Sequence, residues 1–400
     1  MAVYKIFPQK DASIYTISQS MNTGLDEILE ASTYIKFSAP QVSRYLLKFS
    51  DTEIKNILGS DFTTAGRAGS SSLDGNYKIY LNNYAAVVSG LNLDQQLKIY
   101  PISGSWEMGT GHLFDAPQVT NGVSWKFRNY SGSTADGALQ WNTSGVSGSA
   151  VTASYTATTE GGGNWYTASS NAPIPTGGPT VASQSFSYGN GVDLSADVTD
   201  IVKVWHSNSI NNTLGFPNDG FLIKQQRSRE FVNNKAVTAT FRYFSIDTNT
   251  IYPPQLEFRW RDVVFDTGSS DNKILGQQES FISIYNNDGT YYSESIARFR
   301  VAAIPKYPDI VFQTASLYTT NFYLPPTSSL YAIKDTDTNE YVVPFDSEYT
   351  QISADATSSF FDVYMNGLEP ERNYTILIQT QLDGVTQVFD EDIMFKVING

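Results

Sequence analysis

Short stretches in which apolar and polar residues alternate recur along the whole chain, and residues that favour turns separate them. The clearest stretches in the first 260 residues are 44–49, 77–81, 96–101, 221–224, 239–246 and 256–260. A period of two places alternate side chains on opposite faces of a strand, and aromatic or β-branched residues suit a half-buried, pleated surface. The pattern therefore predicts an all-β protein.

Two segments carry the signals of short helices instead. A helix is predicted over 51–58, with Ser50 as its N-cap, Glu53 three residues later and Gly59 at its end. A second helix is predicted over 198–206, with Asp197 as its cap. Its apolar face contains Trp205, which we expect to lie in the core of the first domain. The residues expected to be core together with it are Ile201, Val202, Leu46 and Phe221.

The last 130 residues repeat the strand pattern at the spacing of a small sandwich. The predicted strands are 281–285, 291–293, 298–302, 329–334, 341–344, 360–364, 374–379 and 389–397. Asn286-Asn287-Asp288-Gly289 predicts a hairpin turn between the first two. The stretch from Gly367 to Tyr374 is similar to the turn and tyrosine of fibronectin type III and related immunoglobulin-like domains. We therefore expect an immunoglobulin- or fibronectin-III-like β-sandwich over 271–400.

The larger first domain is predicted over 1–265, and the turn-rich Asp266–Asp271 marks its end. Long stretches rich in Gly, Ser and Thr occupy about 126–190 of this domain. A flexible linker is one interpretation of these stretches. Isolated Trp and Tyr residues within them favour the other, in which ordered loops are anchored to a sandwich by their aromatic side chains.

Composition narrows the class of protein. The chain of 400 residues has 25 Tyr, 23 Phe and 6 Trp, which argues against general disorder. Its net charge of −14 disfavours direct binding to nucleic acid. It has no Cys, which excludes disulfides and thiolate chemistry and fits assembly in a reducing cytoplasm. We expect no signal peptide and no membrane insertion, because no apolar stretch approaches the required length.

The order of motifs over about 4–260 resembles the DNRLRE family, a jelly-roll domain related to carbohydrate-binding modules. The matching segments are Asp11-Ala12, Asn22-Thr23-Gly24, Arg44–Phe49, Trp106 with Val123-Ser124-Trp125, Asp197–Trp205, Gly220-Phe221-Leu222 and Pro254–Phe258. The long loops, with Trp-Asn-Thr-Ser-Gly and Gly-Gly-Gly-x-Trp, depart from the family. They look like the form found in virion structural proteins of tailed phages of the marine myovirus type. The resemblance implies a jelly-roll-like β-sandwich, and it does not cover 271–400.

Candidate chemistry is sparse. His206 follows Trp205 at the expected end of the helix. The helix dipole favours a cation there, so we interpret His206 as a cap. His112 is expected in a loop, and no Gly-x-Ser-x-Gly elbow accompanies either histidine. The acidic groups Asp26-Glu27 and Asp390-Glu391-Asp392 are interpreted as solvated faces rather than as a glycosidase pair. Asp335–Glu340 lacks the central Gly and distal Glu of a calcium loop, so a strand-connecting turn is expected. We predict no enzyme, no catalytic residue, no cofactor and no metal.

The aromatic residues of the loop region are the remaining candidate contacts. Trp106, Trp125, Trp141, Trp165 and Tyr166 are candidates for stacking on a glycan or for contact at a subunit interface. Packing inside the sandwich is the alternative for the same tryptophans.

The expected function is that of a non-enzymatic structural protein in the virion of a tailed bacteriophage, in the tail, neck or baseplate or as an accessory on the head surface. We expect synthesis in the cytoplasm of the bacterial host and contacts with other virion proteins and copies of this chain. The alternative is a carbohydrate-binding adhesin or receptor-binding module, whose partner would be a glycan of the host surface. Folds alone do not decide between these functions.

Overall fold

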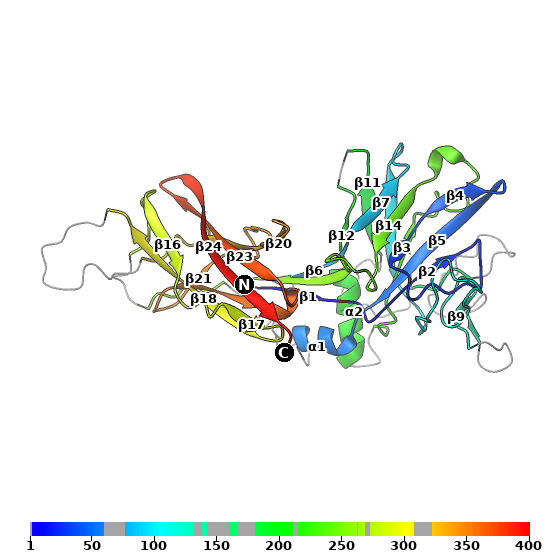
Figure 1. The fold of residues 1–400 in the computed structure, drawn as a ribbon, viewed down its shortest axis with the longest axis horizontal. Helices are drawn as coiled ribbons and strands as arrows, with labels where there is room; N and C mark the ends of the chain where they lie inside the picture. The colour runs from blue at the N-terminus through cyan, green and yellow to red at the C-terminus, as the bar shows by residue number, and fades with distance from the viewer. Residues whose placement is uncertain are drawn as a thin grey trace, which may run out of the picture. The chain divides into compact units, whose positions relative to one another are not determined.

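The computed structural model describes residues 2–59, 77–131, 138–141, 161–166, 181–189, 191–210, 215–261, 263–268, 273–307 and 322–400. Strands predominate in it, and the two α-helices among these residues are eight and twelve residues long (Figure 1). The protein is all-β, as the alternating pattern predicts.

The chain divides into two compact units, and the division differs from the boundary expected at 265–271. The larger unit contains the described residues from Ile6 to Gly59 and from Lys78 to Glu257. The smaller unit contains Phe258–Gly400 and also the first five residues of the chain. The chain therefore leaves the larger unit within strand β15 (Gln255–Trp260). The turn-rich segment near 266 already belongs to the smaller unit.

The larger unit is built on a sheet in the order β11-β8-β13-β5-β2, with β4 paired to β5. A three-stranded sheet has the order β3-β14-β7, while β6 pairs with β12 and β9 with β10. The bounds of these strands are β2 (Lys10–Tyr15), β3 (Ile28–Glu30), β4 (Thr33–Lys36), β5 (Ala39–Lys48), β6 (Tyr77–Asn83), β7 (Ala85–Ser89), β8 (Gln95–Pro101), β9 (Phe127–Asn129), β10 (Leu139–Gln140), β11 (Ala182–Phe186), β12 (Leu194–Asp197), β13 (Phe221–Gln225) and β14 (Thr240–Phe244).

Both predicted helices are confirmed. Helix α1 (Asp51–Leu58) begins after Ser50, whose side chain accepts from the Glu53 N–H at 3.3 Å, and Gly59 ends it with φ +98°. Helix α2 (Thr199–Ile210) begins beside Asp197, whose carboxylate accepts from the Thr199 N–H at 3.0 Å. These side chains satisfy N–H groups that the first turn of a helix leaves open.

Trp205 is buried as predicted, and so are Ile201, Val202 and Phe221. Leu46 is buried too, as predicted, but it lies opposite Leu222, while Leu47 lies opposite Phe221. Neighbouring residues of a strand face opposite sides, so Leu47 shares the face of Phe221, and Leu46 contributes to a separate cluster on the other face of the sheet.

The smaller unit consists of two sheets with an immunoglobulin-like arrangement (Figure 1). One sheet has the order β16-β18-β22-β21, and the other has the order β17-β24-β23-β19-β20. The bounds are β16 (Ser280–Ile284), β17 (Thr290–Tyr292), β18 (Ile296–Pro305), β19 (Leu330–Asp335), β20 (Tyr341–Val343), β21 (Ser353–Ala354), β22 (Ser359–Tyr364), β23 (Asn373–Leu382) and β24 (Val385–Ile398).

The hairpin predicted around Asn286-Asn287-Asp288-Gly289 is wrong, because its two strands join different sheets. β16 pairs with β18, whereas β17 pairs in parallel with β24. The asparagines explain the change of sheet. The Asn286 side chain accepts from the Arg300 N–H of β18 at 2.6 Å, and Asn287 donates to the Met394 carbonyl of β24 at 2.7 Å.

The predicted turn and tyrosine are confirmed as a tyrosine corner. The Tyr374 hydroxyl donates to the Glu369 carbonyl, five residues upstream, at 2.9 Å. Tyr374 stands near the start of β23, at the corner where this motif occurs in immunoglobulin-like sandwiches. Its ring is buried against Phe395, with 5.6 Å between the ring centroids.

Candidate functional site

The outer face of the larger sheet carries a second hydrophobic cluster, which we call the aromatic layer. Four indoles from the loops between residues 102 and 166 cover apolar side chains of β2, β5 and β13. The buried members are Ala12, Ile14, Val42, Leu46, Ile102, Trp106, Val123, Trp125, Trp141, Trp165 and Leu222. The described residues of these loops are therefore anchored to the sheet by aromatic side chains, while 132–137, 142–160 and 167–180, which include most of the Gly/Ser/Thr-rich stretches, lie outside the described residues.

Two of the indole N–H groups of the aromatic layer are bonded to backbone carbonyls, whereas that of Trp125 is buried with no hydrogen-bond partner among the described residues. The Trp106 indole N–H donates to the Asp219 carbonyl at 2.8 Å, and the Trp141 indole N–H donates to the Ser124 carbonyl at 2.9 Å. The Asn22 amide donates to two backbone carbonyls of the same loops, at 2.6 and 2.8 Å. Buried polar groups destabilise a fold when they lack such partners, so these bonds fix the loops on the sheet.

The glycine triplet 161–163 lets the backbone approach the indoles closely. All three residues have positive φ, at +107°, +80° and +94°, a conformation that glycine adopts without strain. A Cβ on Gly162 would lie 2.7 Å from both the Arg44 guanidinium and the Trp125 ring. The triplet therefore allows close packing of the backbone against these side chains. It lacks the Lys-Ser/Thr sequence that follows the glycines of a phosphate-binding loop.

A buried arginine is the centre of the aromatic layer. Arg44 on β5 forms two parallel bonds to the Glu230 carboxylate, at 2.9 and 3.0 Å, and a third to the Gly162 carbonyl at 2.6 Å. Its guanidinium carbon lies 4.9 Å from the Trp125 ring centroid and 5.6 Å from that of Trp165. This arrangement combines a bidentate ion pair with cation–π contacts.

Lys224 on β13 shares the same carboxylate. Its Nζ lies 2.5 Å from Glu230 Oε2 and donates to the Gln225 carbonyl at 2.9 Å. Burial lowers the pKa of Lys224 to about 8, and the attraction of Glu230 opposes that effect. The side chains of Arg44, Lys224 and Glu230 are at most 4% exposed, so two buried cations share one carboxylate.

The structure places the five predicted contact residues in this region. Trp106, Trp125, Trp141 and Trp165 are each 5% exposed or less. Tyr166 is half-buried and stacks on Phe216, with 4.2 Å between the ring centroids. The indole faces pack within the unit and form no open platform for a sugar ring. Their use as contacts to a glycan or a neighbouring protein stays a prediction.

Sequence reasoning missed the Arg44–Glu230–Lys224 group. One signal was present, because Arg44 directly precedes the apolar run Tyr45-Leu46-Leu47, and a buried charge requires a partner. Nothing in the sequence indicates that this partner is Glu230, 186 residues away.

The two histidines have different surroundings. The interpretation of His206 as a helix cap is wrong, because α2 continues to Ile210. His206 is buried, and its Nε2 lies 3.0 Å from the Gly59 carbonyl at the end of α1. Burial lowers its pKa, so a neutral ring is favoured. His112 lies in an exposed loop, as predicted, where its N–H donates to Asp115 at 2.7 Å.

Three aspartates of the larger unit, Asp11, Asp26 and Asp247, lie close enough to interact electrostatically. Asp11 is buried and accepts from the Ile246 N–H at 2.7 Å, while its other oxygen has no partner among the described residues. Burial, with smaller contributions from Asp247 and Asp26, raises the pKa of Asp11 to about 8. Burial also raises the pKa of Asp26, to about 6, against the attraction of His112. Asp11 is therefore protonated near neutral pH.

The remaining acidic candidates lie elsewhere. Asp335 closes the turn after β19 by accepting from the N–H groups of Asp337 and Thr338, each at 2.9 Å. This confirms the strand-connecting turn. Asp390-Glu391-Asp392 is exposed on β24, at a register shift, and belongs to a different unit from Asp26.

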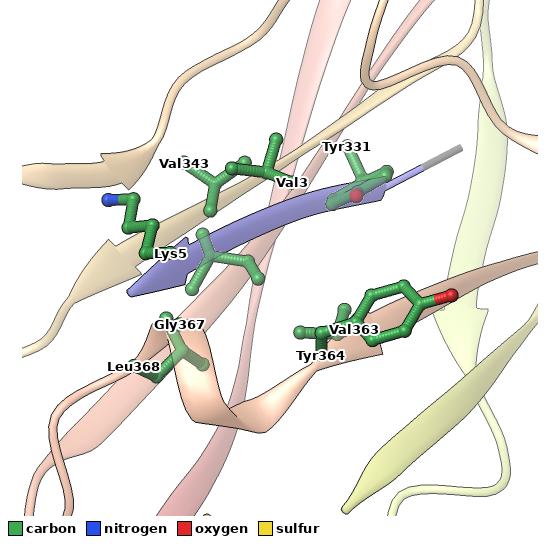
Figure 2. A pocket seen from close by; sticks show the side chains of 9 residues that line it. Val3, Lys5, Tyr331, Val343, Val363, Tyr364, Gly367 and Leu368 are labelled. Atoms are coloured by element: carbon green, nitrogen blue, oxygen red, sulfur yellow. The ribbon is translucent and has the colours of Figure 1, made fainter. Parts of the chain in front are cut away.

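A small cavity in the smaller unit marks the place of the N-terminal strand β1 (Ala2–Ile6) (Figure 2). Val3 and Lys5 lie over side chains from β19, β20 and β22, and the cavity between them measures about 10 Å³. Such a volume holds about one water molecule at most. The Lys5 ammonium donates to the Val342 carbonyl at 2.9 Å. This feature is a packing seam and is too small for an organic ligand.

No protein-family model matches the chain, and no curated protein sequence matches it. Among the described residues, no group of three or more acidic or histidine side chains is arranged to hold a metal ion. No helix in the same part of the chain is long and apolar enough to cross a membrane.

Proposed function

We propose that this protein is a non-enzymatic structural component of the virion of a tailed bacteriophage, where it makes protein–protein contacts within the particle. Its partners are neighbouring subunits, namely other virion proteins and copies of this chain. The proposal rests on the sequence resemblance over 4–260 and on one surface of the smaller unit.

That surface is the outer face of β16, β18 and β22, and we call it the arginine–aromatic face. Phe281 on β16 lies directly opposite Ile304 on β18, and their side chains are 62% and 40% exposed. Further along, the Arg298 guanidinium carbon lies 4.1 Å from the ring centroid of Phe360, and Arg298 pairs with Asp362 at 2.8 Å. The face thus combines exposed apolar side chains with oriented arginines.

This composition supports a role in protein contact. Aromatic residues and arginine are enriched in protein interfaces and among the side chains that contribute most to binding. The outer face of the main sheet in the larger unit is covered by the aromatic layer, whereas Phe281 and Ile304 remain open to solvent among the described residues. The exposed apolar pair and the nearby oriented arginines together support a surface that meets a partner.

The proposal assigns no catalytic role to the chain. It also favours protein contact over the adhesin alternative, since the four indoles considered for sugar stacking are used in packing the larger unit.

Mass spectrometry of purified particles tests the proposal, with the chain expected among the virion proteins. The Phe281→Lys, Ile304→Glu double variant should fold, because opposite charges at directly paired positions suit a sheet, but it should be depleted from particles by about tenfold or more, because charges replace the apolar pair. Val388→Lys, at a 51% exposed position on the other sheet, is the matched control and should be incorporated normally. Absence of the wild-type chain from virions would reject the proposal.

A further inference from the structure

A row of cations crosses the main sheet of the larger unit on the side of the aromatic layer. Lys224 on β13 lies directly opposite Lys98 on β8. On the other side of β13, Ile223 lies opposite Tyr45, so Arg44 occupies the next position along β5. Arg44 and Lys224 both contact Glu230. The three cations therefore stand on three neighbouring strands of a protein whose net charge is −14.

Directly opposed like charges destabilise a sheet, and Glu230 supplies only one negative charge to this row. Arg227, beyond the end of β13, also repels Lys224 and contributes to lowering its pKa. No carboxylate is found paired with Lys98 in the described part of the chain, and this side chain is half-exposed. The row therefore has an excess of positive charge that solvent reaches at Lys98.

A second pair of opposed lysines on the same sheet has carboxylates nearby that compensate its positive charge. Lys10 lies opposite Lys48, and Glu107 Oε2 is 2.7 Å from the Lys10 Nζ. Lys48 attracts the Asp219 carboxylate and thereby lowers the pKa of Asp219, although burial has a larger effect and raises it. Each opposed pair thus has one directly bonded carboxylate, but Glu230 is shared with Arg44, so the row that contains Lys98 and Lys224 has the larger excess of positive charge.

We propose that Lys98 and Lys224 form a binding site for an oxyanion, namely a phosphate, sulfate or carboxylate group. Lys98 contacts the anion from the solvent side. The Lys224 side chain is 4% exposed, and its ammonium is bonded to Glu230 and Gln225, so it contributes its charge from beneath the surface. Arg44 contributes its charge from below. Tyr100 follows Lys98 on the same face, and its ring lies 5.4 Å from that of Trp165, at the edge of the aromatic layer. The site is independent of the proposed virion role.

Calorimetric titration of the full chain with sodium sulfate and sodium phosphate tests this site, with sodium chloride at matched ionic strength as the reference. Sulfate or phosphate should bind, and Lys98→Gln should weaken binding by about tenfold, because a charge-assisted bond is lost. Lys36→Gln removes an exposed lysine of the same unit and should bind as the wild type does. Equal weakening in both variants, or no binding above the chloride reference, would overturn the proposal.

The melting temperature measured in anion-free buffer distinguishes a role of Lys98 in anion binding from a role in stabilising the fold. Lys98→Glu places a carboxylate opposite Lys224, so its melting temperature in anion-free buffer should rise above that of the wild type, and sulfate at low millimolar concentration should no longer raise it further. A fall in melting temperature would show that Lys98 supports the fold and would count against the site.

The source of the anion is distinguished by three further titrants. Glucuronate and glucose 6-sulfate carry the group on a sugar, and glucose is the neutral control. Tighter binding of either charged sugar than of inorganic sulfate would assign the site to a saccharide, and equal binding would assign it to the free ion. Binding of glucose with the same affinity as the charged sugars would refute recognition of an oxyanion.

Discussion

Trp205 of α2 packs against Phe221 of β13, with 4.5 Å between their ring centroids. Phe221 in turn lies edge-on to Phe49, at 6.1 Å. The three buried rings join the second helix to the end of β5 and the start of β13. This contact fixes α2 on one face of the main sheet while the aromatic layer occupies the other face.

Trp205→Ala should destabilise the larger unit by roughly 3–5 kcal/mol, because it removes a fully buried indole and leaves a cavity. The smaller unit should be unaffected, since its core consists of different residues. Limited proteolysis over a temperature ramp, with fragments identified by mass spectrometry, measures both units in one experiment. Tyr188→Ala, at an 89% exposed position, is the control. A thermally silent Trp205→Ala would contradict the burial of this helix.

The sequence predicts features that depend on near neighbours. Both helices are found because Ser50 and Asp197 cap N–H groups two or three residues away, and most strands are found because their alternation is local. The hairpin at Asn286–Gly289 fails for the same reason. Its turn residues are suitable, but bonds to β18 and β24 decide the path of the chain.

The candidate site was less accessible to prediction. The tryptophans were identified as notable residues, but their burial depends on the close approach of 161–163 to Arg44 and Trp125. The opposition of Lys98 and Lys224 depends on strand register across 126 residues of sequence, for which no local pattern exists. Assignment of the N-terminal strand to the smaller unit rests on contacts such as Lys5 to Val342.

Tyr374→Phe should destabilise the smaller unit by about 1–2 kcal/mol, because it deletes the hydroxyl of the tyrosine corner and leaves the Glu369 carbonyl without this donor. Chemical denaturation measures the effect. Tyr341→Phe, at a 51% exposed position, should change stability by less than about 0.5 kcal/mol. Equal effects of the two substitutions would argue against a stabilising corner.

Val3→Asp should destabilise the smaller unit, although Val3 is more than 250 residues distant in sequence from its core. Val3 packs against that core, and Tyr4 lies 5.8 Å from Tyr364 between ring centroids. A charge at this partly buried position should cost roughly 2–3 kcal/mol. Hydrogen exchange should show faster exchange in β19 and β22, with unchanged protection in β5 and β13. Gln9→Asp, at an exposed position, is the control, and increased exchange confined to the larger unit would contradict the assignment.

Asp11 should make the stability of the larger unit fall as pH rises. The pKa of Asp11 is about 8 in the folded protein, whereas an exposed aspartate in the unfolded chain has its ordinary value of 3.8. At a pH between these two values, the folded state therefore holds a proton that the unfolded state has released. The stabilisation is complete below about pH 4 and is lost as pH approaches 8.

Asp11→Asn keeps an oxygen for the Ile246 N–H and removes the ionisation. The variant should therefore lose this slope and exceed the wild type at pH 8 by roughly 2–5 kcal/mol. Urea denaturation at pH 5 and pH 8 measures it, and the exposed Asp94→Asn should retain the wild-type slope. An unchanged slope in Asp11→Asn would show that Asp11 ionises at its ordinary pH in the fold.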